Sequence, residues 1–153
     1  MLFSPSIAYV MTGRCLLATF VVGTNSFPSS ITIFGGSQPS AATVTANWGA
    51  YRTAFLAHFP GAAWSQPGQG PLLQLTVPPA AAATLTGTAT WAIIWDSSLS
   101  LATVQGNALP STVFAVVPVS LNTGTGVIRL SNTSLVAATS YTIYDGSFGV
   151  TTP

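Results

Sequence analysis

The chain has 153 residues, of which 48% are hydrophobic and only 3% are charged, with three Lys or Arg against two Asp or Glu. This length suits a single domain built around one core. A net charge of +1 provides no basic surface for phosphate groups, which argues against nucleic acid as a partner. A chain this apolar is not expected to be disordered, and with so few charges we expect it to exist in an assembly.

The first 30 residues combine apolar runs with Pro5 and an internal Arg14, an arrangement that does not favour a cleaved secretion signal. The longest apolar run, residues 15–22, is shorter than the roughly 20 residues that a membrane-spanning helix needs, so no membrane association is predicted. The single cysteine, Cys15, cannot form an internal disulfide. We interpret residues 1–30 as an N-terminal strand arm.

Proline and glycine clusters divide the rest of the chain into short runs rich in Val, Ile, Thr and aromatic residues, which is typical of β proteins. The predicted strands cover residues 16–22, 31–34, 72–77, 85–95, 113–119, 126–130, 139–144 and 148–151. Such a series of strands, separated by turns, predicts a single all-β domain over residues 1–153, with an antiparallel β-sandwich or jelly-roll-like fold.

The clearest strand pattern lies in residues 85–95, where apolar and threonine residues alternate with a period of two. Trp91, Ile93 and Trp95 share one parity with Leu85, so we expect these three side chains to lie in the core. Ile94 interrupts the polar parity, which indicates that the outer face is also covered near the end of the strand.

Helical spacing is visible only in residues 47–59, where Trp48, Tyr51, Phe55 and Phe59 approximate a stripe along one helix face. We therefore predict at most one short helix, in this segment. Residues 106–126 form a long connection that we interpret as an inserted hairpin or arm.

The side chains that could carry chemistry are few: His58, Asp96, Asp145, Cys15 and hydroxyl groups. A triad of His58 with either carboxylate lacks a nucleophile elbow, and Asp145 stands in a Tyr-Asp-Gly-Ser turn signature. One His, one Cys and two Asp are too few for a metal site, and no phosphate-binding glycine loop is present. We therefore predict no catalytic residues, no metal and no cofactor.

The aromatic residues of the loop-rich middle of the chain are candidates for a surface role. Trp48, Tyr51, Phe55 and Trp64 could pack in the core, contact another subunit or stack against a ligand such as a glycan. The sequence leaves these alternatives open.

Three stretches in fixed order resemble a group of small β-sandwich structural proteins of tailed bacteriophages. They are ITIFGGSQPSAA (31–42), TGTATWAIIWDSS (86–98), and a C-terminal stretch that contains LSNTSL (130–135), YTI (141–143) and FGVTTP (148–153). The resemblance covers about residues 31–153 and carries over no catalytic residues.

The resemblance implies a non-enzymatic part of a virion. Together with the scarcity of charge, it favours a capsid cement or decoration protein that binds the major capsid protein through apolar contacts. The alternative is a tail, neck, baseplate or fibre subunit that contacts tail proteins and binds glycans through exposed Trp or Tyr. In either location we expect a homo-oligomer.

Overall fold

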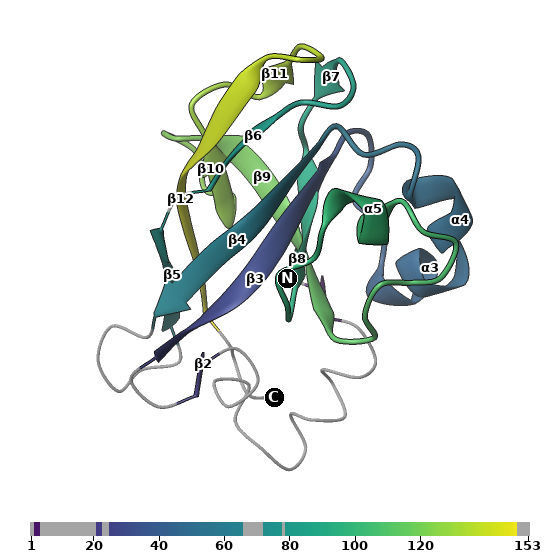
Figure 1. Ribbon diagram of the computed structural model, residues 1–153. Helices are drawn as coiled ribbons and strands as arrows, with labels where there is room; N and C mark the ends of the chain where they lie inside the picture. Colours follow the sequence, from purple (N-terminus) through teal and green to yellow (C-terminus); the bar gives the residue numbers. More distant parts are fainter. Residues whose placement is uncertain (1, 4–20, 23–24, 66–71, 78, 150–153) are drawn as a thin grey trace.

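The computed structural model describes residues 2–3, 21–22, 25–65, 72–77 and 79–149 (Figure 1). Most of these residues lie in strands or short connections, which confirms the all-β prediction. The strands are β1 (Leu2–Phe3), β2 (Val21–Val22), β3 (Asn25–Phe34), β4 (Ala57–Ser65), β5 (Leu72–Val77), β6 (Ala80–Ala82), β7 (Gly87–Thr88), β8 (Trp91–Trp95), β9 (Phe114–Leu121), β10 (Ile128–Leu130), β11 (Ser134–Leu135) and β12 (Ser140–Gly149).

Seven of these strands form a closed ring in the order β9, β10, β12, β5, β4, β3 and β8, and β8 pairs again with β9. The sheet is therefore a barrel, and the predicted sandwich or jelly roll is not confirmed. Alternation of apolar and polar residues is the same in a sandwich and in a barrel, because both bury one face of each strand. Closure depends instead on β8, which joins two strands that are distant in sequence.

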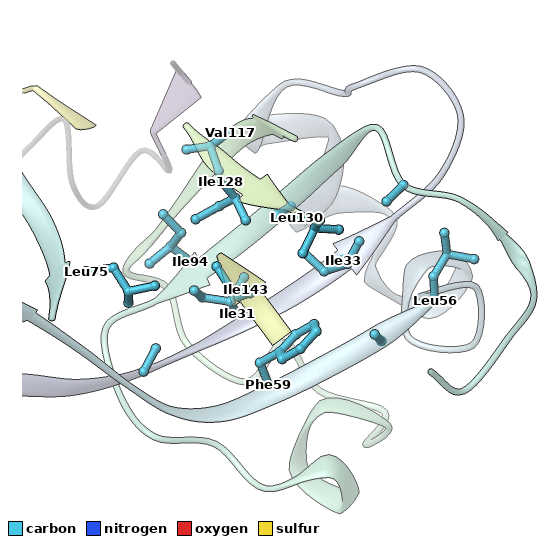
Figure 2. Packing of buried hydrophobic residues seen from close by; sticks show 14 of the residues in the cluster. Ile31, Ile33, Leu56, Phe59, Leu75, Ile94, Val117, Ile128, Leu130 and Ile143 are labelled. Carbon is cyan, nitrogen blue, oxygen red and sulfur yellow. The ribbon is translucent and has the colours of Figure 1, made fainter. Parts of the chain in front are cut away.

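The interior of the barrel is filled by aliphatic side chains and two large aromatic rings. Figure 2 shows Ile31, Ile94, Ile128 and Ile143 pointing toward one another from four different strands. Leu75 and Leu56 lie toward opposite ends of this cluster. The barrel is thus a packed core and offers no channel between these residues.

A second apolar layer lies outside the barrel wall, between β3, β8 and β9 and three short helices (Figure 1). Its largest members are Phe34, Trp48, Phe55, Trp91, Trp95 and Phe114. All five residues of β8 are buried, because Ala92 and Ile94 face the interior while Trp91, Ile93 and Trp95 face the helices. Both faces of β8 are therefore covered along its whole length. The sequence, through Ile94, had indicated this only near the end of the strand.

The predicted strand 85–95 is interrupted, because β7 ends at Thr88 and β8 begins at Trp91. Ala89, between the two strands, packs with the interior cluster, whereas Trp91 packs with the outer one. Leu85 is 41% exposed, so its predicted place on the buried face is wrong. The threonines of the opposite parity are exposed.

Three short helices occur in the described residues, where at most one was predicted: α3 (Ala41–Ala46), α4 (Trp48–Tyr51) and α5 (Leu101–Val104). Ser40 and Ser100 cap α3 and α5, each by accepting a hydrogen bond from the backbone N–H three residues later. The aromatic stripe of residues 47–59 is not one helix. Trp48 and Tyr51 belong to α4, Phe55 to a loop and Phe59 to β4.

Residues 106–126 contain β9, a strand of the ring, so this segment is part of the barrel wall. β9 and β10 are parallel although only six residues separate them, because β10 starts beside Val119, near the end of β9. The return turn is tight at Gly126, where a Cβ atom would lie 2.7 Å from the backbone nitrogen of Ser120. Only glycine fits this turn without a shift of the backbone.

β12 is continuous, although residues 139–144 and 148–151 were predicted as two strands separated by a turn at Asp145 and Gly146. The backbone stays extended there, and Gly146 faces Trp64 and Ile128 too closely for most side chains. Of the predicted strand 16–22, only residues 21–22 are described, as β2, and residues 150–151 lie outside the described part of the chain. The arm predicted for residues 1–30 is described only in β1, β2 and the first part of β3.

Candidate functional site

In the described residues, two groups of charged or imidazole side chains project outward from strands of the barrel wall, whereas Arg52 and Asp96 lie in segments between strands. His58 projects outward from β4, and Arg129 and Asp145 project outward from β10 and β12. The first group is covered by the segment that follows β8, and the second is not.

His58 is the centre of a buried chain of hydrogen bonds that joins β8, β3 and β4. The Trp95 Nε1–H donates to Thr32 Oγ1 at 2.9 Å, and Thr32 Oγ1 lies 3.0 Å from His58 Nδ1. On the other side of the ring, His58 Nε2 lies 2.8 Å from the Leu99 carbonyl oxygen. We call Thr32, His58, Trp95 and the Leu99 carbonyl the His58 cluster.

The partners determine the tautomer of His58, and burial determines its charge. A carbonyl oxygen only accepts, so Nε2 carries the proton, and Nδ1 is free to accept from the Thr32 hydroxyl. Burial lowers the pKa of His58 below its ordinary value of 6.5, and the hydrogen bond to Leu99 partly opposes this change. The ring is therefore neutral near pH 7, with both nitrogens occupied by protein partners.

The His58 cluster also anchors the segment that covers it. Ser30, which precedes Thr32 by two residues on β3, donates from Oγ to the Ser97 carbonyl at 3.0 Å and accepts the Leu99 N–H at 3.3 Å. Thus Leu99 is held by its N–H and by its carbonyl, from two adjacent strands. These polar groups fasten the loop that leads into α5 to the barrel wall.

The hydrolase interpretations of the sequence find no geometry in the described residues. His58 hydrogen-bonds to neither carboxylate, since Asp145 pairs with Arg129 and Asp96 accepts from the Ser97 hydroxyl. Asp96 follows β8 and Asp145 lies on β12, with at least two strands of the ring between them. Within the described part of the chain, His58, Asp96 and Asp145 are therefore not joined into an acid-base pair.

The four tryptophans are all buried, with exposed fractions between 0% and 4%. Trp64 fills the barrel interior and donates from Nε1 to Ser29 Oγ at 2.6 Å. Trp48 packs edge-on against Trp95, with ring centroids 5.4 Å apart. Phe55 is buried and Tyr51 half-buried in the same outer layer. Stacking of a ligand on Trp48, Phe55 or Trp64 would require an accessible ring face, so packing is the role that the geometry supports.

The uncovered group lies where β12 bulges against β10. Arg129 is opposite Asp145, whereas the next residue, Leu130, is opposite Ile143. Tyr144 is therefore the extra residue, and both Tyr144 and Asp145 reach the outer face. Arg129 donates from Nη2 to Asp145 Oδ2, and Tyr144 is 61% exposed. We call Arg129, Tyr144 and Asp145 the Tyr144 face.

Sequence reasoning assigned the Tyr144 face no role, because Asp145 and Gly146 have the composition of a turn. The signal that could have revealed it is the strong apolar character of the flanking residues Ile143 and Phe148, which favours a strand through the turn signature. The hydroxyl of Thr32 was likewise missed, because a threonine in a strand is common.

The described residues contain no group of three or more His, Cys, Asp or Glu side chains that could hold a metal ion. No helix found among them has the length and the apolar character required to cross a membrane. No family model, no curated protein and no solved structure matches the chain.

Proposed function

We propose that this chain is a non-enzymatic structural subunit of a tailed-phage virion, and that it acts as a capsid cement or decoration protein. The observation that carries the proposal is the near absence of charge, five Lys, Arg, Asp and Glu residues in 153, in a chain that folds into a doubly layered barrel. Such a surface binds other proteins through apolar and backbone contacts more readily than through ion pairs.

The arrangement of the three phage-like stretches supports the same proposal. Residues 31–34 of the first stretch pair with residues 91–94 of the second, and residues 87–88 of the second pair with residues 134–135 of the third. The three stretches therefore contain strands that pair with one another, in the barrel and in the two-stranded sheet of β7 and β11. The resemblance rests on these residues alone, and it implies a particle component without indicating head or tail.

The polar groups of the His58 cluster form hydrogen bonds within the protein, which also favours a structural role. Thr32, His58 and Ser30 hold the covering loop, and none of them is available to a substrate. Exposed apolar side chains occur elsewhere on the described surface, at Leu85, Leu101, Leu121 and Val136. These are side chains that a neighbouring subunit would cover.

The test is to determine the copy number of the chain in purified particles by quantitative mass spectrometry, and its position by electron microscopy of labelled particles. Hundreds of copies on the head are expected for a cement protein. A handful of copies at the neck, baseplate or fibre would favour the alternative location, and absence from particles would contradict the proposal.

The type of contact can be tested on the same particles. We expect the subunit to stay attached in about 1 M sodium chloride, where the Debye length is about 3 Å, and to be released by dilute guanidinium, which weakens apolar contacts. Release by sodium chloride alone, without unfolding, would show that Arg14, Arg52 or Arg129 carries the contact.

A further inference from the structure

We infer that the Tyr144 face is a binding site for a neutral saccharide. This site is independent of the virion proposal, because it concerns the isolated chain and follows from the outer wall of β10 and β12. The inference combines three features of the face: an accessible aromatic ring, an ion pair with unused hydrogen-bonding groups, and the absence of net charge.

The accessible ring is that of Tyr144. At 61% exposed it is the most exposed of the large apolar side chains in the described residues, whereas the tryptophans are buried. The bulge explains why it points outward: an extra residue in β12 places Tyr144 beside Asp145 on one face, while Ile143 and Gly146 remain buried. A tyrosine ring presents an apolar surface to the C–H face of a sugar and a hydroxyl to its edge.

The ion pair beside the ring still has hydrogen-bonding capacity. Asp145 uses Oδ2 for Arg129 Nη2, and within the described residues neither Asp145 Oδ1 nor Arg129 Nη1 has a partner. The two side chains are 27% and 29% exposed, so both can reach a ligand. A carboxylate oxygen accepts and a guanidinium donates, and this combination suits vicinal hydroxyl groups, which do both.

The charge of the face selects against ionic ligands. Arg129 and Asp145 neutralise each other, and the chain as a whole has a formal charge of +1, so no field attracts a phosphate, a sialic acid or a polyanion.

The experiment is saturation-transfer NMR followed by calorimetry on the full-length chain. The probes are maltotriose, cellotriose, chitotriose and N-acetyllactosamine, with sialyllactose and inorganic phosphate as ionic comparisons. We expect at least one neutral probe to bind, and Tyr144→Ala to weaken that binding by at least about tenfold, which corresponds to about 1.4 kcal/mol. Tyr144→Phe keeps the ring and should remain within about threefold, and Asp145→Asn should weaken binding through loss of the charged acceptor.

Val136→Ala is the matched control, because Val136 is also more than half exposed but lies outside the face, in the turn after β11. It should bind like the wild type. The inference is overturned if no neutral probe binds at millimolar concentration, or if Tyr144→Ala binds as well as Val136→Ala. It is also overturned if the ionic probes bind more tightly, or if Tyr144→Ala changes self-association in light scattering while saccharide binding is unchanged, which would make the face a protein contact.

Discussion

The barrel wall carries two polar clusters that are made of similar groups and differ in what covers them. The His58 cluster, on β3, β4 and β8, is closed over by the loop before α5, and Thr32 and His58 are at most 5% exposed. The Tyr144 face, on β10 and β12, has no covering element within the described residues, and its tyrosine is mostly exposed. A polar side chain that another segment covers stabilises the fold, whereas one that no segment covers is available to bind a partner.

The difference in burial also predicts how substitutions in the His58 cluster and on the Tyr144 face change the free energy of unfolding. A buried polar group that loses its partner costs the full penalty of desolvation, whereas an exposed group exchanges its partner for water. Substitutions under the helices should therefore act on stability, and substitutions on the Tyr144 face should act on binding.

The largest effects are expected in the apolar layer around the His58 cluster. Trp91 stacks on Phe34 with ring centroids 4.2 Å apart and donates from Nε1 to the Gly35 carbonyl. We expect Trp91→Ala and Ile93→Ala each to lower the free energy of unfolding by about 2–5 kcal/mol, the range for large buried side chains. Tyr144→Ala should stay within about 0.5 kcal/mol of the wild type.

The free energy of unfolding of all three variants can be measured by urea denaturation that is monitored by circular dichroism. The division between the two clusters would be wrong if Trp91→Ala cost less than about 0.5 kcal/mol, or if Tyr144→Ala cost as much as Ile93→Ala.

A smaller effect is expected from Thr32→Val, which keeps the shape of the side chain and removes its hydroxyl. The Trp95 Nε1–H and His58 Nδ1 then lose their shared partner inside the protein. An unsatisfied buried group costs about 1–3 kcal/mol, so a loss of at least this size is expected in chemical denaturation. Thr32→Ser retains the hydroxyl and should recover most of the stability. Equal stability of the two variants would show that the hydrogen bonds contribute nothing.

These residues also show which parts of the molecule were accessible to sequence reasoning. The alternation over residues 85–95 predicted burial of Trp91, Ile93 and Trp95, and Ile94 indicated that the outer face is also covered near the end of the strand; all of these side chains are buried. Ring closure was not predictable from such patterns, since it depends on β8 meeting both β3 and β9. A sandwich built from the same strands would have the same periodicity.

The two clusters also differ in why the sequence did not predict them. The sequence identified His58 as one of the few ionisable side chains, but its partners lie 26 and 41 positions away, so no local motif could predict them. The Tyr144 face was hidden by a local signal that tertiary structure overrides: Asp145 and Gly146 favour a turn, yet pairing of Arg129 with Asp145 and of Ser147 with Gln74 keeps β12 extended.

The pH dependence of stability should report on His58. Burial lowers its pKa in the folded state, so below pH 6.5 the unfolded chain binds a proton that the folded chain does not. Stability is therefore greatest above pH 6.5, declines as the pH falls below this value, and stops declining on this account once the folded histidine is also protonated. Denaturation at a series of pH values between about 7 and 5, where histidine is the side chain that ordinarily titrates, measures this slope.

His58→Gln is the control for this slope, because glutamine can donate to the Leu99 carbonyl and accept from Thr32 but does not titrate. The variant should lose the pH dependence in this range whatever its absolute stability. A slope that persists in His58→Gln, or stability that rises as the pH falls, would contradict the assignment of a neutral, buried ring.

The smallest effect is expected for the ion pair of the Tyr144 face. Arg129 and Asp145 are each a little more than a quarter exposed, so water and salt screen much of their attraction, and such pairs contribute about 0–1 kcal/mol. A double-mutant cycle with Arg129→Gln and Asp145→Asn, measured by urea denaturation at low salt and in about 1 M sodium chloride, isolates their coupling. We expect coupling below about 1 kcal/mol that decreases with salt. Coupling above about 2 kcal/mol that resists salt would place this pair with the His58 cluster, as a structural element.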